Sequence, residues 1–211
     1  MSSIVVFGVT GYAGGHITAE LLDRGHTVVG VARDISQATA REGLELRAGS
    51  IYDPAFRTET VQGADAVVVA LPAHPADGPD LETIVPGLLE AVAGARVGVV
   101  GGAASLLATE GGPLVLDTLP EEYKPESEAN ARVLDALRRA STTVDWFYLS
   151  PALSFGSWNA GEKTGTFRLG TDVLITDADG KSEISGADYA IAFVDEIEKP
   201  AHHQTRFTVG Y

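Results

Sequence analysis

The sequence predicts an α/β fold of the doubly wound type, a parallel sheet with helices on both faces. Short apolar runs recur along the chain with helical patterns between them, at residues 4–7, 27–32, 44–48, 64–72 and 96–100. The run at 64–72 is almost continuously apolar, which is typical of a parallel strand buried on both faces. The first run leads directly into closely spaced glycines, which permit a tight turn before a helix.

These glycines are Gly8, Gly11 and Gly14, and a helix is expected over 16–24. Backbone amides at a helix N-terminus can hold a phosphate, and glycines let the chain approach it closely. The Gly-x-x-Gly-x-x-Gly spacing is typical of the short-chain dehydrogenase/reductase superfamily, which this opening resembles. We therefore expect a dinucleotide cofactor here, and a turn that serves packing alone is the alternative. The other expected cofactor contacts in this loop are Thr10, Tyr12 and Ala13.

Length and composition restrict the class of protein. The chain has 211 residues, enough for one domain spanning 1–211. Its formal net charge of -14 argues against nucleic-acid and anionic-membrane partners, and the lack of cysteine excludes disulfides and thiolate chemistry. The start has no signal-peptide pattern, and the apolar run at 97–108 is shorter than the roughly 18 residues of a membrane span. We expect a cytoplasmic protein, a monomer or homodimer, with a small-molecule partner.

The end of the second strand bears on the choice of cofactor. An acidic residue roughly 20 positions past the glycines usually binds the adenosine ribose, whereas an arginine there accommodates the 2'-phosphate of NADP. The strand at 27–32 is followed by Arg33 and then Asp34. Asp34 could instead begin a turn or cap a helix expected over 36–42. We therefore expect NADP in preference to NAD.

Two further strand ends are expected to border the cofactor. The strand at 44–48 leads into a turn whose Asp53 should cap the next helix, which leaves Ser50 and Ile51 as the expected adenine contacts. The strand at 64–72 ends beneath the expected cofactor, followed by a loop at 73–80 and a helix at 81–93. Its contributions to the site are Ala70, Leu71 and Pro72.

The strand at 96–100 is followed by Gly101, Gly102 and, shortly after, Ser105. Two glycines allow close backbone approach at the crevice where open α/β sheets bind ligands. Gly101 is therefore a candidate cofactor contact. Ser105 either orients a substrate oxygen or is a solvated turn residue.

Several blocks together point to a family: 101–106, 120–126, 145–152, 161–165, 184–190 and 206–211. They resemble the atypical short-chain dehydrogenase/reductases of the NAD(P)H-binding and NADH-flavin reductase type, relatives of biliverdin reductase B and of NmrA-like proteins. The resemblance implies a Rossmann fold and hydride transfer from a nicotinamide. It also implies that the stretch at 152–155, directly after Pro151, passes close to the nicotinamide, with Pro151 and Ala152 as expected cofactor contacts.

The chain departs from the superfamily in its expected acid. The usual active site pairs a tyrosine with a lysine four residues later, so that the ammonium lowers the pKa of the phenol. No tyrosine here has such a lysine, and Tyr123 and Lys124 are adjacent instead, ahead of a helix expected over 126–140. With Ser105 they are the catalytic candidates. The alternative is that Tyr123 packs and Lys124 is solvated.

The last part of the chain is expected to form a strand at 145–150 and then a substrate-side segment at about 151–185. Short strands are expected at 166–169 and 173–175, and Ser185 with Asp188 forms a capping box for the last helix. The helix acids at 195, 196 and 198 suggest a solvated face. His202 and His203 lack a third ligand at suitable spacing, so no metal is expected.

The main functional hypothesis is an NADPH-dependent reductase of a conjugated acceptor such as a flavin or quinone, in which the protein orients rather than protonates. The missing tyrosine-lysine pair leaves open a non-catalytic NADP sensor. A sugar-nucleotide epimerase or dehydratase is disfavoured by the short C-terminal region.

Overall fold

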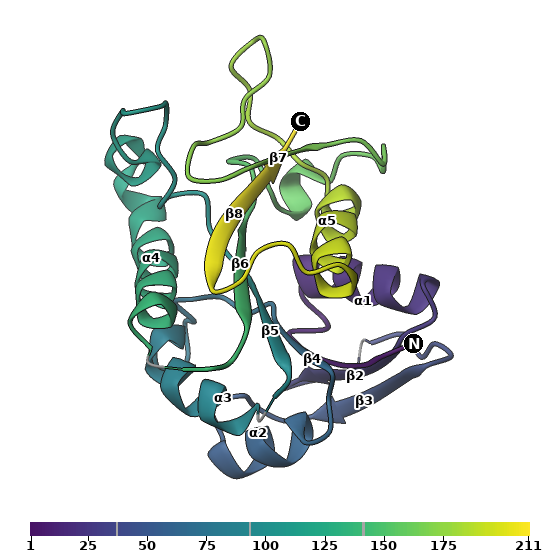
Figure 1. Cartoon of the computed structure of the whole chain (residues 1–211). Coiled ribbons are helices and arrows are strands. Elements are labelled where there is room, and N and C mark those ends of the chain that lie inside the picture. Colours follow the sequence, from purple (N-terminus) through teal and green to yellow (C-terminus); the bar gives the residue numbers. More distant parts are fainter. Residues whose placement is uncertain (37, 93, 141) are drawn as a thin grey trace.

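The computed structural model describes residues 1–36, 38–92, 94–140 and 142–211 and contains one eight-stranded sheet (Figure 1). The strand order is β3-β2-β1-β4-β5-β6-β8-β7, and every neighbouring pair is parallel except β7 with β8. The strands are β1 (Ser3–Phe7), β2 (Thr27–Ala32), β3 (Leu44–Ala48), β4 (Ala66–Val69), β5 (Arg96–Val100), β6 (Trp146–Ser150), β7 (Arg168–Gly170) and β8 (Thr205–Gly210). The predicted fold class is confirmed.

Helices cover both faces of the sheet, as a doubly wound fold requires (Figure 1). The α-helices are α1 (Tyr12–Asp23), α2 (Pro54–Val61), α3 (Val85–Ala91), α4 (Lys124–Arg139) and α5 (Gly186–Glu198). Helices α1 and α5 pack on one face, while α2, α3 and α4 pack on the other. Short 3-10 turns lie at Leu81–Ile84, Val115–Thr118, Glu121–Tyr123 and Ser157–Asn159.

The central strands β1, β4 and β6 are apolar at nearly every position because each contributes side chains to two hydrophobic cores, one on each face of the sheet. In β6, Trp146 and Tyr148 point toward α4, whereas Phe147 lies among residues of α5 and β8. Alternate side chains of a strand point to opposite faces, so a strand covered on both sides needs apolar residues at every position. Burying each large side chain stabilises the fold by about 1.5 to 3 kcal/mol.

Several expected boundaries differ from the structure. The helix containing Lys124 begins at that residue rather than at 126, and α1 begins at Tyr12 rather than at 16. The strand expected at 64–72 is limited to Ala66–Val69, and the helix expected at 81–93 is a 3-10 turn followed by α3, with residue 93 outside the described residues. The stretch at 173–175 forms only a single bridge, between Val173 and Leu107.

The helix expected over 36–42 was wrong for the residues described there, which form turns and irregular chain, and residue 37 lies outside the description. The Asp34 carboxylate accepts a hydrogen bond of 2.8 Å from the backbone N–H of Ser36, two residues on. That contact closes a local turn and competes with helix capping. Asp34 therefore begins a turn, one of the alternatives left open by the sequence.

Candidate functional site

The loops after β1 and β4 meet where the chain order of the sheet reverses. Strands β1 and β4 are neighbours, with β2 on the far side of β1 and β5 on the far side of β4. Such a switch point, at the carboxyl ends of the strands, is where open α/β sheets bind ligands. The first glycine loop lies at this point.

Two of the loop glycines are required by close backbone packing. Gly8 has φ +95°, and a Cβ there would lie 2.1 Å from the carbonyl oxygen of Ala70. A Cβ on Gly14 would lie 2.1 Å from the carbonyl oxygen of Gly8. Gly11 is less crowded, since a Cβ there would lie 3.2 Å from the Gly8 oxygen, and its N–H donates to that oxygen at 2.9 Å. The glycines thus bring α1, the loop and β4 into direct contact.

No side chain of the described residues caps the N-terminus of α1. Its N-cap is Gly11, which has no side chain to accept from the amides that follow. The neighbouring N-terminus of α5 is different, because Ser185 accepts from the N–H of Asp188 and the Tyr12 hydroxyl accepts from the N–H of Gly186. Unsatisfied first-turn amides and the helix dipole favour a bound anion. Of these two helix ends, α1 is the one suited to a pyrophosphate.

A cavity of about 360 Å³ extends from this loop across the ends of β2, β3 and β4. It brings together many of the predicted cofactor residues, namely Gly8, Thr10, Gly11, Arg33, Ser50, Ile51, Ala70, Leu71 and Pro72. Tyr12, Ala13 and Gly14 instead form the first turn of α1. Gly101, Pro151 and Ala152 follow the neighbouring strands β5 and β6 and do not line this cavity.

Part of the cavity wall was not predicted from the sequence. The missed lining residues include Tyr52, Pro75, Asp77, Gly78 and Pro79. The Tyr52 hydroxyl is buried with no hydrogen-bond partner among the described residues, and burial raises the pKa of that phenol. A proline- and glycine-rich loop directly after a central strand was the available signal, but its composition indicated only a turn.

At the end of β2, Arg33 lines the cavity and Asp34 does not. Arg33 is exposed and lines the cavity. The Asp34 carboxylate is engaged by Ser36, and the hydrogen bond from the Ser36 backbone lowers the pKa of that carboxyl. The arrangement leaves an exposed guanidinium, rather than a carboxylate, at this end of the cavity.

Tyr12 contacts the substrate-side segment with its side chain. The hydroxyl donates to the carbonyl of Ala160 at 3.2 Å and accepts from the N–H of Gly186 at 2.9 Å. The ring lies edge-on to Phe155, with 5.4 Å between ring centroids. Only the backbone of Tyr12 is therefore free to meet a phosphate, while its side chain fastens residues 155–160 to the first turn of α1.

No hydrogen bond or ion pair among the described residues joins one catalytic candidate to another. Ser105 accepts a hydrogen bond of 3.3 Å from the buried guanidinium of Arg206, which also binds Asp172. Tyr123 is 57% exposed, and the Lys124 ammonium pairs with Glu121. The Glu121 contact is the main cause that raises the pKa of Lys124. No contact in the described residues joins Lys124 to a tyrosine hydroxyl, so the geometry shows no activated phenol.

Asp188 holds the middle of the substrate-side segment. Its buried carboxylate accepts from the hydroxyl of Tyr211 at 2.7 Å and from the N–H groups of Thr164 and Gly165 at 2.9 and 2.8 Å. The capping box was therefore only half correct. Ser185 accepts from the Asp188 N–H, but the Ser185 N–H donates to Tyr211 instead.

Burial alone would raise the pKa of Asp188, but these hydrogen bonds outweigh it and the net pKa is lowered. A lowered folded-state pKa stabilises the protein above the unfolded value and loses that contribution as pH falls through the folded value. We expect Asp188→Asn to cost about 1 to 3 kcal/mol of unfolding free energy at pH 7. The cost should shrink as pH falls below about 4, the ordinary carboxyl value, and on through the lowered folded-state pKa at which the native carboxyl takes up its proton.

Denaturant unfolding at several pH values measures this difference, with Asp179→Asn as the control because Asp179 lies exposed in a turn. Equal stability of the Asp188 variant and the wild type at pH 7 would contradict the assigned role.

The histidines near the C-terminus contact two carboxylates that also pair with Arg96. His202 Nδ1 lies 2.8 Å from Glu196, and His203 Nδ1 lies 3.0 Å from Asp145. Glu196 also pairs with the buried Arg96 and is itself buried, so the solvated face expected for the acids of α5 was wrong at this position. The described residues contain no group of three or more potential metal ligands.

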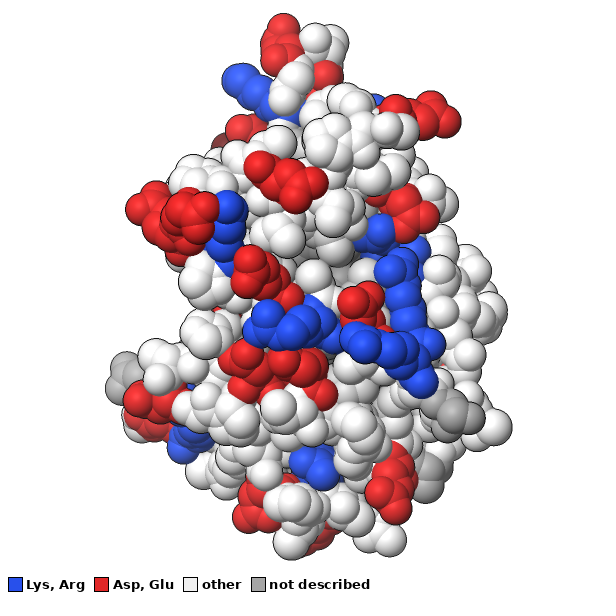
Figure 2. Space-filling view, turned by 90° about the vertical axis from the view of Figure 1, so that its left-hand side faces the viewer, with Lys and Arg blue, Asp and Glu red and all other residues white. Residues whose placement is uncertain are grey.

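The face covered by α2, α3 and α4 carries interspersed charges (Figure 2). Basic side chains lie beside acidic ones there. Arg132, for example, pairs with both Asp80 and Glu82.

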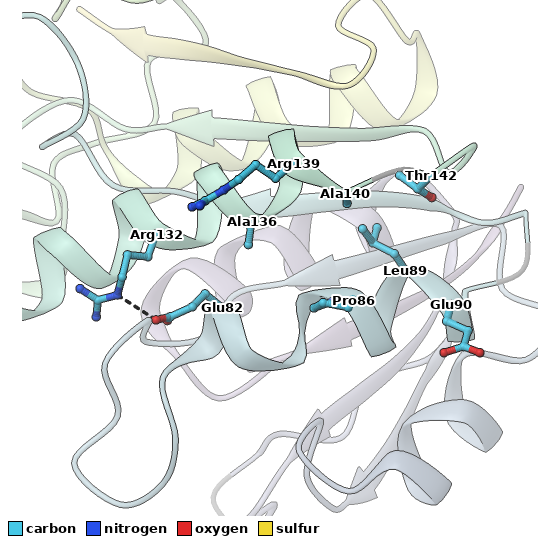
Figure 3. A pocket seen from close by; sticks show the side chains of 9 residues that line it. All are labelled: Glu82, Pro86, Leu89, Glu90, Arg132, Ala136, Arg139, Ala140 and Thr142. Carbon is cyan, nitrogen blue, oxygen red and sulfur yellow. Dashed lines mark hydrogen bonds and ion pairs between the residues drawn. The ribbon is translucent and has the colours of Figure 1, made fainter.

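A second cavity of about 540 Å³ lies on this side between α3 and α4, with the Glu82–Arg132 pair at one end and Leu89 and Ala136 along it (Figure 3). None of its lining residues belongs to the glycine loop or lines the first cavity, and its charged residues are Glu82, Glu90, Arg132 and Arg139. No helix in the described part of the chain is long and apolar enough to span a membrane.

Comparisons with known proteins identify the family of the chain. The NAD(P)H-binding family matches residues 8–200. The uncharacterized protein YwnB of Bacillus subtilis is 35% identical over 98% of this chain and 97% of its own.

Two solved structures are also similar in sequence and shape. A Bacteroides thetaiotaomicron protein provisionally named an epimerase is 34% identical, covers 100% of this chain and 97% of its own, and has a TM-score of 0.88. A Streptococcus pneumoniae protein provisionally named an NADH-flavin reductase is 33% identical, covers 100% and 99%, and has a TM-score of 0.83. The predicted resemblance is confirmed, and the chain belongs to the NAD(P)H-binding family.

Proposed function

We propose that this protein is an NADPH-dependent reductase that transfers a hydride to a small conjugated acceptor such as a flavin or quinone. The observation that carries the proposal is the uncapped N-terminus of α1 opening on a cavity that also contains Arg33. An anion site and a guanidinium that line one cavity would suit the pyrophosphate and the 2'-phosphate of NADPH. The provisional name of the Streptococcus pneumoniae relative supports the flavin class.

The residues present fit a dinucleotide. The first-turn amides of α1 would hold the pyrophosphate, the wall formed by Ser50, Ile51 and Tyr52 would hold the adenosine, and Ala70–Pro72 would lie beneath the cofactor. The bound nicotinamide supplies the hydride. The protein's own contribution would be to place the acceptor over it and to exclude water.

The site needs no strong acid for this chemistry. Tyr148 and Tyr189 are fully buried, and burial raises the pKa of both phenols. A reduced flavin or quinone can take its proton from water, so orientation is sufficient. The acceptor would be held by Ser105, Tyr123 and the chain near Pro151 and Ala152, with Lys124 nearby.

The test is NADPH oxidation followed by absorbance, with a panel of flavins and quinones as acceptors. Binding of NADPH and NADH is titrated in parallel. Binding with turnover supports the reductase, and binding without turnover supports a non-catalytic NADP sensor. The sensor is the second candidate because Lys124 pairs with Glu121 and activates no tyrosine.

Within the reductase, we expect Ser105→Ala and Tyr123→Phe each to lower turnover by about 3- to 30-fold, the size of one lost hydrogen bond or slightly more. A loss of about 100-fold or more for Tyr123→Phe, with a rate that falls at alkaline pH, would instead make Tyr123 a general acid. Steady-state kinetics with NADPH affinity measured separately distinguishes these results. Wild-type rates in both variants would remove both residues from the site.

A further inference from the structure

We propose that Glu126 is a positioning residue that fixes the loops after β4 and β5 relative to each other beside the crevice. The inference rests on the proposed reductase function. Its basis is an unbroken chain of hydrogen bonds that begins at the loop after β4, crosses the first turns of α4 and ends at the loop after β5.

The chain begins with both oxygens of the Glu126 carboxylate. Oε1 accepts from the N–H of Ala73 and Oε2 from the N–H of His74, each at 2.8 Å. Hydrogen bonds to an ionised acceptor are about twice as strong as neutral ones. Ala73 directly follows the segment Ala70–Pro72 that lines the cofactor cavity, so Glu126 fixes the peptide orientation at the end of that wall.

Asn130, one helical turn further along α4, carries the chain onward. Its side-chain Nδ2 donates to Glu126 Oε1 at 2.8 Å, and its backbone carbonyl oxygen accepts from the Tyr148 hydroxyl at 3.1 Å. The same hydroxyl accepts from the N–H of Gly102 at 3.0 Å. Tyr148 is wholly buried in β6, so its hydroxyl has a fixed position and no solvent to compete for it.

The lack of a side chain at Gly101 and Gly102, directly after β5, permits these contacts. A Cβ on Gly101 would lie 2.1 Å from the Tyr148 ring, and a Cβ on Gly102 would lie 3.1 Å from the Cβ of Asn130. The backbone of Gly101 and Gly102 therefore packs directly on Tyr148 and Asn130, the two residues that continue the series of hydrogen bonds. The sequence suggested that Gly101 and Gly102 leave space for a ligand. In the structure, the space that a Cβ would need at these two positions is filled by Tyr148 and Asn130.

Strands β4 and β5 are parallel neighbours, so the loops after them form adjacent walls of the same crevice. One wall continues from the cofactor cavity, and the other leads to Ser105. Hydride transfer needs the reacting atoms within about 3 to 3.5 Å, and a displacement of about 1 Å can cost about 100-fold in rate. A rigid link between the walls is therefore expected to act on the chemical step more than on cofactor affinity.

The first test is Glu126→Gln, with Glu128→Gln as the matched control. Glutamine keeps the size but replaces one of the two accepting oxygens with an NH2 donor, which would face the N–H of Ala73 or of His74. Glu128 loses the same charge two residues away and is exposed. We expect kcat to fall about 10- to 100-fold for Glu126→Gln and less than 2-fold for the control.

NADPH affinity should change less than about 3-fold, because the loop keeps the His74–Asp80 contact and the Leu81 to Ala73 backbone bond. The primary deuterium isotope effect with NADPH labelled at the transferred position should rise, since the hydride step becomes more rate-limiting. A purely structural loss would lower the amount of folded enzyme without changing this isotope effect.

A double-mutant cycle with Tyr148→Phe provides the second test. That substitution keeps the buried ring and removes only the hydroxyl that joins Asn130 to Gly102. If the chain acts as one unit, the double variant should be little slower than the slower single variant. Additive losses, an unchanged isotope effect or a large loss of NADPH affinity would each overturn the inference. A wild-type protein that binds NADPH but reduces no acceptor would instead overturn the proposed function on which it rests.

Discussion

Replacing Gly14 with alanine or valine should abolish NADPH binding. The added Cβ would lie 2.1 Å from the Gly8 carbonyl oxygen and 3.3 Å from the Ala70 side chain. The first contact is with backbone, so relief requires α1 to move away from the loop. The first-turn amides would then leave the position at which they can hold a pyrophosphate.

Gly15→Ala is the matched control, because it adds the same methyl group one residue further along α1. Its Cβ would meet only the Val9 carbonyl oxygen, at 3.6 Å, which is ordinary contact. Alanine also has the higher helix propensity, by roughly 1 kcal/mol. Titration of NADPH by fluorescence, with circular dichroism to confirm folding, should show lost affinity for Gly14→Ala and retained affinity for Gly15→Ala. Two folded variants with wild-type affinity would end the assignment of the pyrophosphate to this loop.

The sheet was predictable because its physical signal is local in the sequence. A strand buried on both faces must be apolar at nearly every position, and β1, β4 and β6 satisfy this. The glycine loop was predictable for a similar reason. Only glycine allows the φ of +95° at Gly8 together with contact to Ala70.

Features that depend on distant partners were not predictable from local patterns. Glu196 resembles a solvated acid in the sequence, yet it is buried beside Arg96, one hundred residues away. Gly101 and Gly102 suggested a ligand, because nothing near them in the sequence shows that Tyr148 and Asn130 pack there.

The catalytic candidates show the same limit. Ser105 was correctly expected after β5, but its contact with Arg206 joins residues 101 positions apart. The adjacent Tyr123 and Lys124 also have different surroundings, since Tyr123 is exposed and Lys124 pairs with Glu121. Residue type and strand order thus place a side chain near the crevice, while its actual partners follow from the tertiary structure.

Arg33→Ala should weaken NADPH binding by roughly 10- to 100-fold and leave NADH binding nearly unchanged, a difference of about 1.5 to 3 kcal/mol for a charge-assisted contact. Arg33 lines the cavity at the end of β2, where a 2'-phosphate would lie, and NADH carries no such group. Arg47→Ala is the control, because Arg47 lies on the adjacent strand β3, pairs with Glu45 and does not line the cavity.

Asp34→Asn should have little effect on either cofactor, since the Asp34 carboxylate closes the turn at Ser36. Parallel titrations of NADPH and NADH with all three variants decide the question. Equal losses for both cofactors in Arg33→Ala, or tighter binding of NADH than NADPH by the unmutated protein, would transfer the ribose contact to Asp34 and reverse the proposed cofactor preference.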